Sequence, residues 1–175
     1  MLSKIAYYPS LAFNIFMSKV SSRTWYNRLD DTVIVGALPF KSVTHELIKQ
    51  ENVKAMVTTN EDFELQYLTY NKQELSSLGV DQLRLVIADL TGTPTLTDIV
   101  SAVDFIMDHR KKGNSVYVHC KAGRTRSATI AMCYLVQLHK WTPEQSLDYM
   151  KSKRPHVWLR PKQLASVQEF YDKCC

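Results

Sequence analysis

The chain has 175 residues, of which 45% are hydrophobic and 22% charged, and its formal net charge is +5. These values are typical of one soluble globular domain with a single core. Residues 1–29 contain four basic and no acidic residues, so the rest of the chain carries only +1. This distribution argues against a nucleic-acid-binding face spread over the body of the protein, and we expect no nucleic-acid partner.

Residues 1–22 mix aromatic and aliphatic side chains with serine and lysine, but Pro9, Ser10 and Asn14 interrupt the apolar pattern. No run of 18 apolar residues exists, so the segment is not expected to span a bilayer. A basic, acid-free, weakly amphipathic leader suits mitochondrial import or a helix lying in a membrane interface. The alternative is an N-terminal helix packed on the body. We therefore predict a leader at residues 1–23 and one folded domain at residues 24–175.

From residue 25 onward, short apolar runs alternate with segments of helical spacing. Strands are expected at 25–26, 33–36, 54–58, 82–88 and 115–118, and helices at 42–51, 71–78, 97–112, 127–139, 143–154 and 161–173. Residues 61–64 are expected to form a loop. Strands alternating with helices, followed by helices alone, predict an α/β fold with a mainly parallel central sheet flanked by helices on both faces.

The segment around Cys120 is the most informative part of the sequence. An apolar strand pattern ends at this cysteine, and a helix begins after Arg126. The five residues between them include one glycine and no acid, a length that can wrap backbone N–H groups around a tetrahedral anion at a helix N-terminus. We expect five substrate-binding residues: Lys121, Ala122, Gly123, Arg124 and Thr125.

The helix dipole and the charges of Lys121, Arg124 and Arg126 favour a thiolate at Cys120. A cysteine in such surroundings titrates at roughly 3.5 to 7.5 and is a nucleophile at neutral pH. Arg126 has the planar guanidinium that can hold two oxygens of a phosphoryl group. The alternative, a buried inert cysteine beside a basic turn, fits these surroundings poorly. A metal site is also disfavoured because His119 and Cys120 are adjacent and no second ligand cluster follows, so we expect no cofactor.

The four cysteines, at positions 120, 133, 174 and 175, form no disulfide framework, and a free nucleophile needs a reducing compartment. Cys133 lies within an apolar helical run and is expected in the core. The terminal pair, Cys174 and Cys175, resembles a prenylated tail, but a frayed chain end is the simpler interpretation.

Asp89 is the best candidate for a general acid. It follows an expected strand, as Cys120 does, and both should emerge at the carboxyl edge of a parallel sheet. The alternative is that Asp89 only organises the turn at Thr91 and Gly92. With Asp89 as the acid, Cys120 would form a phosphocysteine, and the hydroxyl of Ser127 could donate to the sulfur as it leaves.

The pattern His119-Cys120, five residues, then Arg126-Ser127 resembles the signature of the cysteine-dependent phosphatases, the tyrosine and dual-specificity superfamily. Segments 25–28, 35–39, 61–64, 79–85, 89–95 and 139–144 extend the resemblance, over about residues 25–173, to the mitochondrial phosphatidylglycerophosphate phosphatases, a dual-specificity-like family. The resemblance implies that Cys120 is the nucleophile, Asp89 the acid and Arg126 the phosphate clamp. It also implies four residues at the rim of the site: Glu61, Asp62, Phe63 and Glu64. Phe63 stands where the family has tyrosine, and Thr125 where it has serine.

The same resemblance implies hydrolysis of phosphatidylglycerophosphate to phosphatidylglycerol, a step toward cardiolipin, at the matrix side of the mitochondrial inner membrane. The partner would be an anionic phospholipid, with peripheral membrane association. The surplus cations of the loop are consistent with a second anionic group on the substrate, although Lys121 and Arg124 could instead only lower the thiol pKa or pair with acids at 61–64. Two other functions stay open: a dual-specificity protein phosphatase acting on phosphotyrosine and phosphoserine/threonine, and a catalytically silent phosphate-binding adaptor.

Overall fold

Five strands form one sheet in the order β1-β2-β5-β3-β4 in the computed structural model, which describes residues 2–175 and, within the first helix, side chains from residue 7 onward. The strands are β1 (Tyr26–Arg28), β2 (Val33–Gly36), β3 (Val53–Thr58), β4 (Asp81–Arg84) and β5 (Ser115–His119). Strands β2, β5, β3 and β4 are parallel, and only β1 pairs antiparallel, with β2. The predicted fold class is therefore confirmed.

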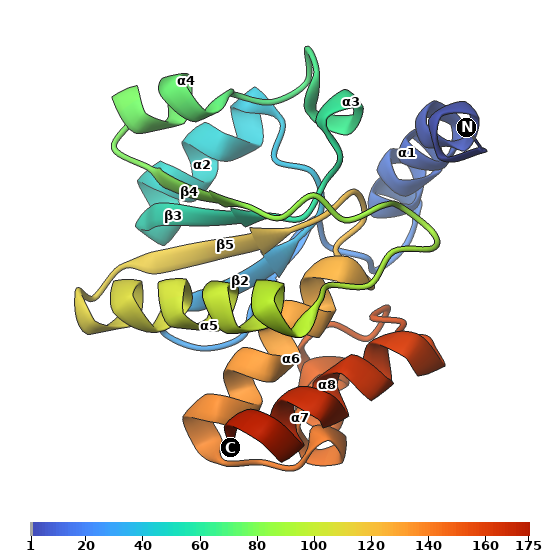
Figure 1. Ribbon diagram of the computed structural model, residues 1–175. Helices are drawn as coiled ribbons and strands as arrows, with labels where there is room; N and C mark the ends of the chain where they lie inside the picture. Colours follow the sequence, from blue (N-terminus) through green and yellow to red (C-terminus); the bar gives the residue numbers. More distant parts are fainter. Residues whose placement is uncertain (1) are drawn as a thin grey trace.

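Helices cover both faces of this sheet, as Figure 1 shows. They are α1 (Leu2–Val20), α2 (Lys41–Glu51), α3 (Asp62–Leu65), α4 (Lys72–Ser77), α5 (Leu96–Lys111), α6 (Arg126–His139), α7 (Pro143–Lys153) and α8 (Pro161–Cys174). Along β5, Val116 and Val118 belong to the core that packs against α5 to α8, whereas Tyr117 belongs to the core under α2 and α4. Successive side chains of a strand point to opposite faces, so the central strands are apolar throughout.

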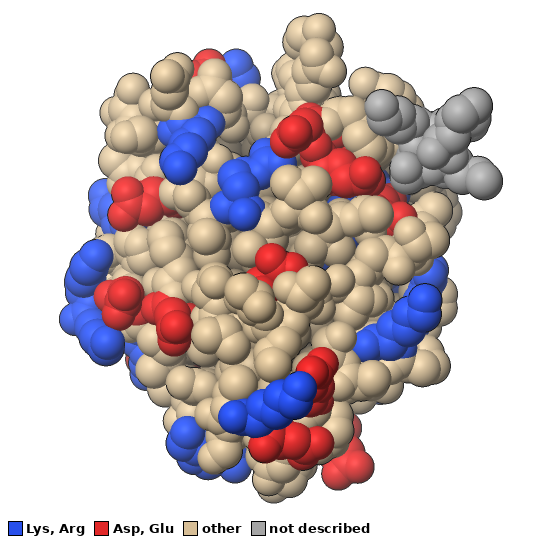
Figure 2. Space-filling view, viewed as in Figure 1, with Lys and Arg blue, Asp and Glu red and all other residues tan. Residues whose placement is uncertain are grey.

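The outer surface of the α5 side mixes both signs of charge. Figure 2 shows acidic and basic side chains interspersed over this view, with no large patch of one sign on the face shown.

Cys133 on α6 is fully buried, as predicted.

Strand β4 is shorter than the predicted segment 82–88. Its partner β3 ends at Thr58, whose carbonyl accepts the last hydrogen bond of the ladder from the Leu85 N–H at 2.9 Å. Beyond that point the chain has no strand to pair with, and Val86 is exposed while Ile87 is buried. The alternation of buried and exposed side chains therefore continues beyond the strand into a loop, and this loop leads directly to Asp89.

Residues 61–64 do not form the predicted loop, because one helical turn, α3, begins at Asp62. A capping box stabilises it: the Glu61 N–H donates to the Glu64 carboxylate at 2.7 Å, and the Glu61 side chain accepts from the backbone of the third helical residue. This turn places Glu64 in the interior.

The N-terminal segment is one continuous helix, α1, which runs through Pro9. Tyr7 and Leu11 are buried and pack with Leu38 of the body, which offsets the cost of the proline. Among the side chains of this helix that the structure describes, from residue 7 onward, four large apolar ones are exposed: Tyr8, Phe13, Phe16 and Val20. Among the residues that the structure describes, no helix has the length and apolar character needed to cross a membrane.

Candidate active site

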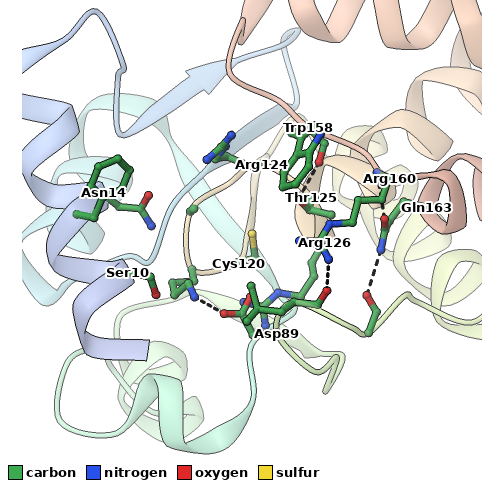
Figure 3. Close-up of a pocket in the computed structure, with 15 residues that line it drawn as sticks. Ser10, Asn14, Asp89, Cys120, Arg124, Thr125, Arg126, Trp158, Arg160 and Gln163 are labelled. Carbon is green, nitrogen blue, oxygen red and sulfur yellow. Dashed lines mark hydrogen bonds and ion pairs between the residues drawn. The ribbon is translucent and has the colours of Figure 1, made fainter. Parts of the chain in front are cut away.

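Cys120 is the first residue after β5, and the loop 120–125 leads into α6, which begins at Arg126. The loop after β4 brings Asp89 to the same edge of the sheet, as expected for the carboxyl ends of parallel strands. A cavity of about 190 Å³ lies above the sulfur. Four segments line it: α1, the loop around Asp89, the catalytic loop and residues 158–163 (Figure 3).

The sulfur of Cys120 is held by donors of its own loop and helix. It accepts hydrogen bonds from the Gly123 N–H at 3.2 Å and from the Ser127 hydroxyl at 3.4 Å. Burial by itself raises the pKa of this thiol, but the Arg126 charge and hydrogen bonds from Ser127 and the Arg124 backbone outweigh it and lower the pKa below the ordinary value. The site therefore favours a thiolate.

Gly123 is required where the catalytic loop passes the end of β2. Its φ is +63°, and a Cβ atom there would lie 2.5 Å from the carbonyl carbon and oxygen of Gly36. Any other residue would combine backbone strain with a steric clash. The loop geometry around the sulfur depends on this glycine.

Arg126 is buried and reaches the site from the first turn of α6. Its Nη1 and Nη2 donate to the two oxygens of Glu64 at 2.7 and 2.9 Å, and Nη2 also donates to Asp89 at 3.0 Å. Burial lowers the pKa of the guanidinium, but Glu64 overcompensates, so the net pKa is raised. Glu64 is fully buried beneath Arg126, so its predicted place at the rim is corrected to a place inside the site.

Asp89 faces two cations. The Lys121 ammonium pairs with its Oδ2 and Arg126 with its Oδ1, and the Asp89 side chain is only 11% exposed. The Asp89 N–H donates to the Glu61 carboxylate at 3.2 Å. Asp89 thus lies beside the cavity of the nucleophile, where a proton donor is needed.

Two residues at the start of α8, its N-cap Arg160 and Gln163, anchor the loop that carries Asp89. Arg160 donates to the Leu90 carbonyl, and the Gln163 amide donates to the Gly92 carbonyl at 3.2 Å. Because these contacts come from 70 and 71 residues further along the chain, no local sequence pattern predicts them.

Some of the remaining predicted site residues line the cavity, and others lie away from it. Ala122, Arg124 and Thr125 line the cavity with Lys121. Asp62, by contrast, is exposed and pairs with Arg84 at 2.7 Å, and Phe63 packs edge-on against Tyr7. Neither Asp62 nor Phe63 lines the cavity.

The three loop cations act on the thiol to different extents. Arg126 provides the main charge that lowers the Cys120 pKa, the charge of Arg124 also interacts with Cys120, and Lys121 pairs with Asp89. Arg124 donates to the His156 carbonyl at 3.0 Å. Neither Lys121 nor Arg124 pairs with the acids of segment 61–64.

Sequence reasoning missed Arg154, which supports the catalytic loop from behind. Its buried guanidinium donates to the carbonyls of Gly123 at 2.7 Å and Ala122 at 3.2 Å, and to the Asn27 side chain at 2.6 Å. Burial lowers its pKa to about 10, so it stays charged at neutral pH. Arg154 thus fixes the Gly123 carbonyl by a hydrogen bond, while the N–H of Gly123 donates to the sulfur of Cys120.

His119 has a structural role. Its ring bonds the Thr58 hydroxyl at 2.9 Å, and burial lowers its pKa to about 3, so the ring is neutral. Its carbonyl accepts from the Thr59 N–H and hydroxyl. This agrees with the interpretation that His119 fixes the loop backbone and does not transfer protons.

The arrangement suits transfer of a phosphoryl group to sulfur. It combines a thiolate, a buried guanidinium, loop N–H groups and an adjacent carboxylic acid, which together supply a nucleophile, charge stabilisation and a proton donor. The described residues contain no group of three or more His, Cys, Asp or Glu side chains that could hold a metal ion.

The chain is similar to known proteins in both sequence and fold. The chain is 43% identical over 173 residues to "Phosphatidylglycerophosphatase and protein-tyrosine phosphatase 1" of Homo sapiens, which covers 97% of this chain and 86% of the human protein. It is 37% identical to "Phosphatidylglycerophosphate phosphatase PTPMT1" of Arabidopsis thaliana, over 97% of this chain and 49% of that protein. A crystal structure of PTPMT1 in complex with PI(5)P superposes with a TM-score of 0.83 at 43% identity, covering 85% of this chain and 96% of that one.

The family model of the dual specificity phosphatase catalytic domain matches residues 39–173, which include Asp89, Cys120 and Arg126. The chain therefore belongs to the dual-specificity phosphatase family and is a cysteine-dependent phosphatase.

Proposed function

We propose that this enzyme hydrolyses the phosphomonoester of phosphatidylglycerophosphate, releasing inorganic phosphate and phosphatidylglycerol, a precursor of cardiolipin. The observation that carries the proposal is the identity of 43% over 97% of the chain with a human protein whose name includes phosphatidylglycerophosphatase. The exposed apolar side chains Phe13, Leu90 and Trp158 line the cavity of Cys120, which suits a substrate held in a membrane.

The first step transfers the phosphoryl group to sulfur. Glu64 holds one edge of the Arg126 guanidinium, while Nη2 contacts Asp89 and Nε makes no hydrogen bond with the described residues. An incoming phosphoryl group would take Nε and Nη2 as a fork and displace Asp89. Asp89, once separated from Arg126, takes up a proton from solvent and donates it to the ester oxygen of the leaving group. The S–P bond forms as the bond between phosphorus and the ester oxygen breaks.

The second step hydrolyses the phosphocysteine. Asp89 is then ionised and can accept a proton from a water that attacks phosphorus. The S–P bond breaks, and the Ser127 hydroxyl, 3.4 Å from the sulfur, stabilises the departing thiolate. Phosphate leaves, and the enzyme returns to its starting state.

A comparison of substrates tests the proposal. We expect kcat/KM on phosphatidylglycerophosphate in detergent micelles to exceed that on phosphotyrosine and phosphoserine peptides by about tenfold or more, a difference of about 1.4 kcal/mol in transition-state binding. Phosphate release measures both. Faster turnover of the peptides would instead favour a dual-specificity protein phosphatase, the function that the second half of the human relative's name supports.

We further propose that the enzyme acts as a peripheral membrane protein at the matrix side of the mitochondrial inner membrane. Helix α1 supports this, since it exposes Tyr8, Phe13, Phe16 and Val20, and Phe13 also lines the cavity of Cys120. Lys19 in its last turn is available to anionic lipid head groups. The segment 1–23 thus serves the site as well as its predicted role as a leader.

Fractionation of cells that express the full chain with a C-terminal tag tests this proposal. We expect the protein in mitochondria, protected from protease until the inner membrane is opened, and released from the membrane by alkaline carbonate. The variant Phe16→Ser should move from the membrane pellet to the soluble matrix, because it removes apolar surface that does not line the cavity. Recovery of the parent protein in the cytosol, or equal pelleting of both variants, would contradict the proposal.

A further inference from the structure

Two guanidinium groups lie against one indole at the mouth of the catalytic cavity. The central carbon of Arg160 is 4.8 Å from the Trp158 ring centroid, and that of Arg124 is 5.9 Å from it. All three residues line the cavity of Cys120, and Figure 3 shows Trp158 and Arg160 on the side opposite Ser10 and Asn14, with Arg124 between Asn14 and Trp158. They come from different parts of the chain, namely the catalytic loop and the segment before α8.

Neither arginine has an acidic partner. The ion pairs of the site join Lys121 and Arg126 to Asp89 and Glu64, and no ion pair among the described residues includes Arg124 or Arg160. Each guanidinium instead donates to a backbone carbonyl, Arg124 to that of His156 and Arg160 to that of Leu90. A guanidinium has five N–H donors, so most of the donors of both remain available for an anion.

The position of this cluster is fixed relative to the nucleophile. The Trp158 backbone N–H donates to the Arg124 carbonyl at 2.9 Å, and the Trp158 carbonyl accepts from the Thr125 hydroxyl at 2.8 Å. Both bonds tie the backbone that carries the indole to the catalytic loop. A group bound between the arginines would therefore keep a constant distance from the sulfur of Cys120.

We propose that Arg160, with Arg124 and the Trp158 platform, binds a second anion of the substrate, the phosphodiester that joins its phosphorylated headgroup to the lipid. The inference rests on the proposed function and specifies how that substrate is distinguished from a simple phosphomonoester. The sequence is consistent with a second anion site among the loop cations, but Lys121 is paired with Asp89. Arg160, which follows Trp158 by two residues, takes that role.

The variant Arg160→Gln tests this with two soluble substrates. Deacylated phosphatidylglycerophosphate carries both the monoester and the phosphodiester, whereas glycerol 1-phosphate carries the monoester alone, and both have an alkoxide leaving group. We expect kcat/KM to fall about tenfold on the first substrate, mainly through KM, and by less than about twofold on the second.

A uniform loss would overturn the proposal. Arg160 also contacts the carbonyl of Leu90, next to Asp89, so a mere displacement of the acid would lower kcat on both substrates equally. Lys162→Gln is the matched control, because Lys162 is exposed, lies only two residues further along the chain than Arg160, in the first turn of α8, and does not line the cavity. It removes the same charge and should leave both substrates unchanged. An equal loss in Lys162→Gln would show a general effect of charge and contradict the assignment.

One further experiment asks whether the bound anion is the phosphodiester of the substrate or a free phosphodiester. Dimethyl phosphate, added to the assay with glycerol 1-phosphate, supplies a free phosphodiester. We expect no change in rate, since the second anion acts through its covalent link to the monoester. A change that depends on Arg160 would show a separate anion site and overturn the proposal. The substrate preference of the parent enzyme tests the proposed function independently, because it does not involve the variant.

Discussion

Replacing Cys120 with serine should lower turnover of phosphomonoesters by on the order of 10⁴-fold or more, as for the loss of a nucleophile in other covalent mechanisms. The site lowers the pKa of the thiol through Arg126 and Ser127, and a serine hydroxyl would remain un-ionised in the same surroundings. Single-turnover phosphate release measures the loss. The parent enzyme should also stay active below the ordinary pKa of cysteine, because its thiolate persists there.

Cys174→Ser is the control for this prediction. It makes the same chemical change at an exposed residue near the chain end, and it should leave activity unchanged. Bound phosphate or vanadate should still protect Cys120→Ser against thermal unfolding, since Arg126 and the loop N–H groups remain. A Cys120→Ser variant as active as the parent would show that the sulfur is not the nucleophile, and the phosphate-binding adaptor would again be open.

The meeting of Cys120, Arg126 and Asp89 at one edge of the sheet could be predicted because their signals are local. Cys120 ends an apolar strand, Arg126 starts a helix six residues later, and Asp89 follows another strand. Strand and helix periodicity places these residues at one sheet edge without any knowledge of tertiary contacts. The presence of the five strands, though not the end of β4, and most helix bounds follow from the same local patterns.

The supporting residues could not be predicted in this way. Glu64 sits among other acids in the sequence, and a carboxylate is normally exposed, so only its pairing with Arg126, 62 residues away, shows that it is buried. Arg154 resembles an ordinary basic residue at a helix end, yet it holds two carbonyls of the catalytic loop. Such roles are set by long-range contacts.

Helix α1 illustrates the same limit. Its sequence favours a leader separate from the domain, but Tyr7 is fully buried and its hydroxyl donates to the Glu64 carbonyl at 2.5 Å. The Tyr7 ring also lies 5.7 Å from the Lys121 ammonium. Composition predicted that the segment is basic and apolar, and only the fold shows that it forms one wall of the active site.

Replacing Glu64 with glutamine should destabilise the protein by about 3 to 5 kcal/mol and also lower kcat, because it removes one partner of a buried ion pair. The N–H₂ group of the glutamine amide would face the N–H donors of Arg126 and repel them. Asp89 would become the only acidic partner of Arg126. Asp89 would then be released less easily by an incoming phosphoryl group. Urea unfolding measures the stability, and phosphate release measures the rate.

Two further variants separate the structural role of this pair from its catalytic role. Asp62→Asn changes an exposed carboxylate two residues away and should alter stability by less than about 1 kcal/mol. The double variant Glu64→Leu with Arg126→Met replaces both buried charges by apolar groups, which often restores stability. It should regain much of the lost free energy of unfolding while remaining inactive, because no fork is left to hold the phosphoryl group. A double variant that recovers activity along with stability would show that Glu64 and Arg126 act only in folding.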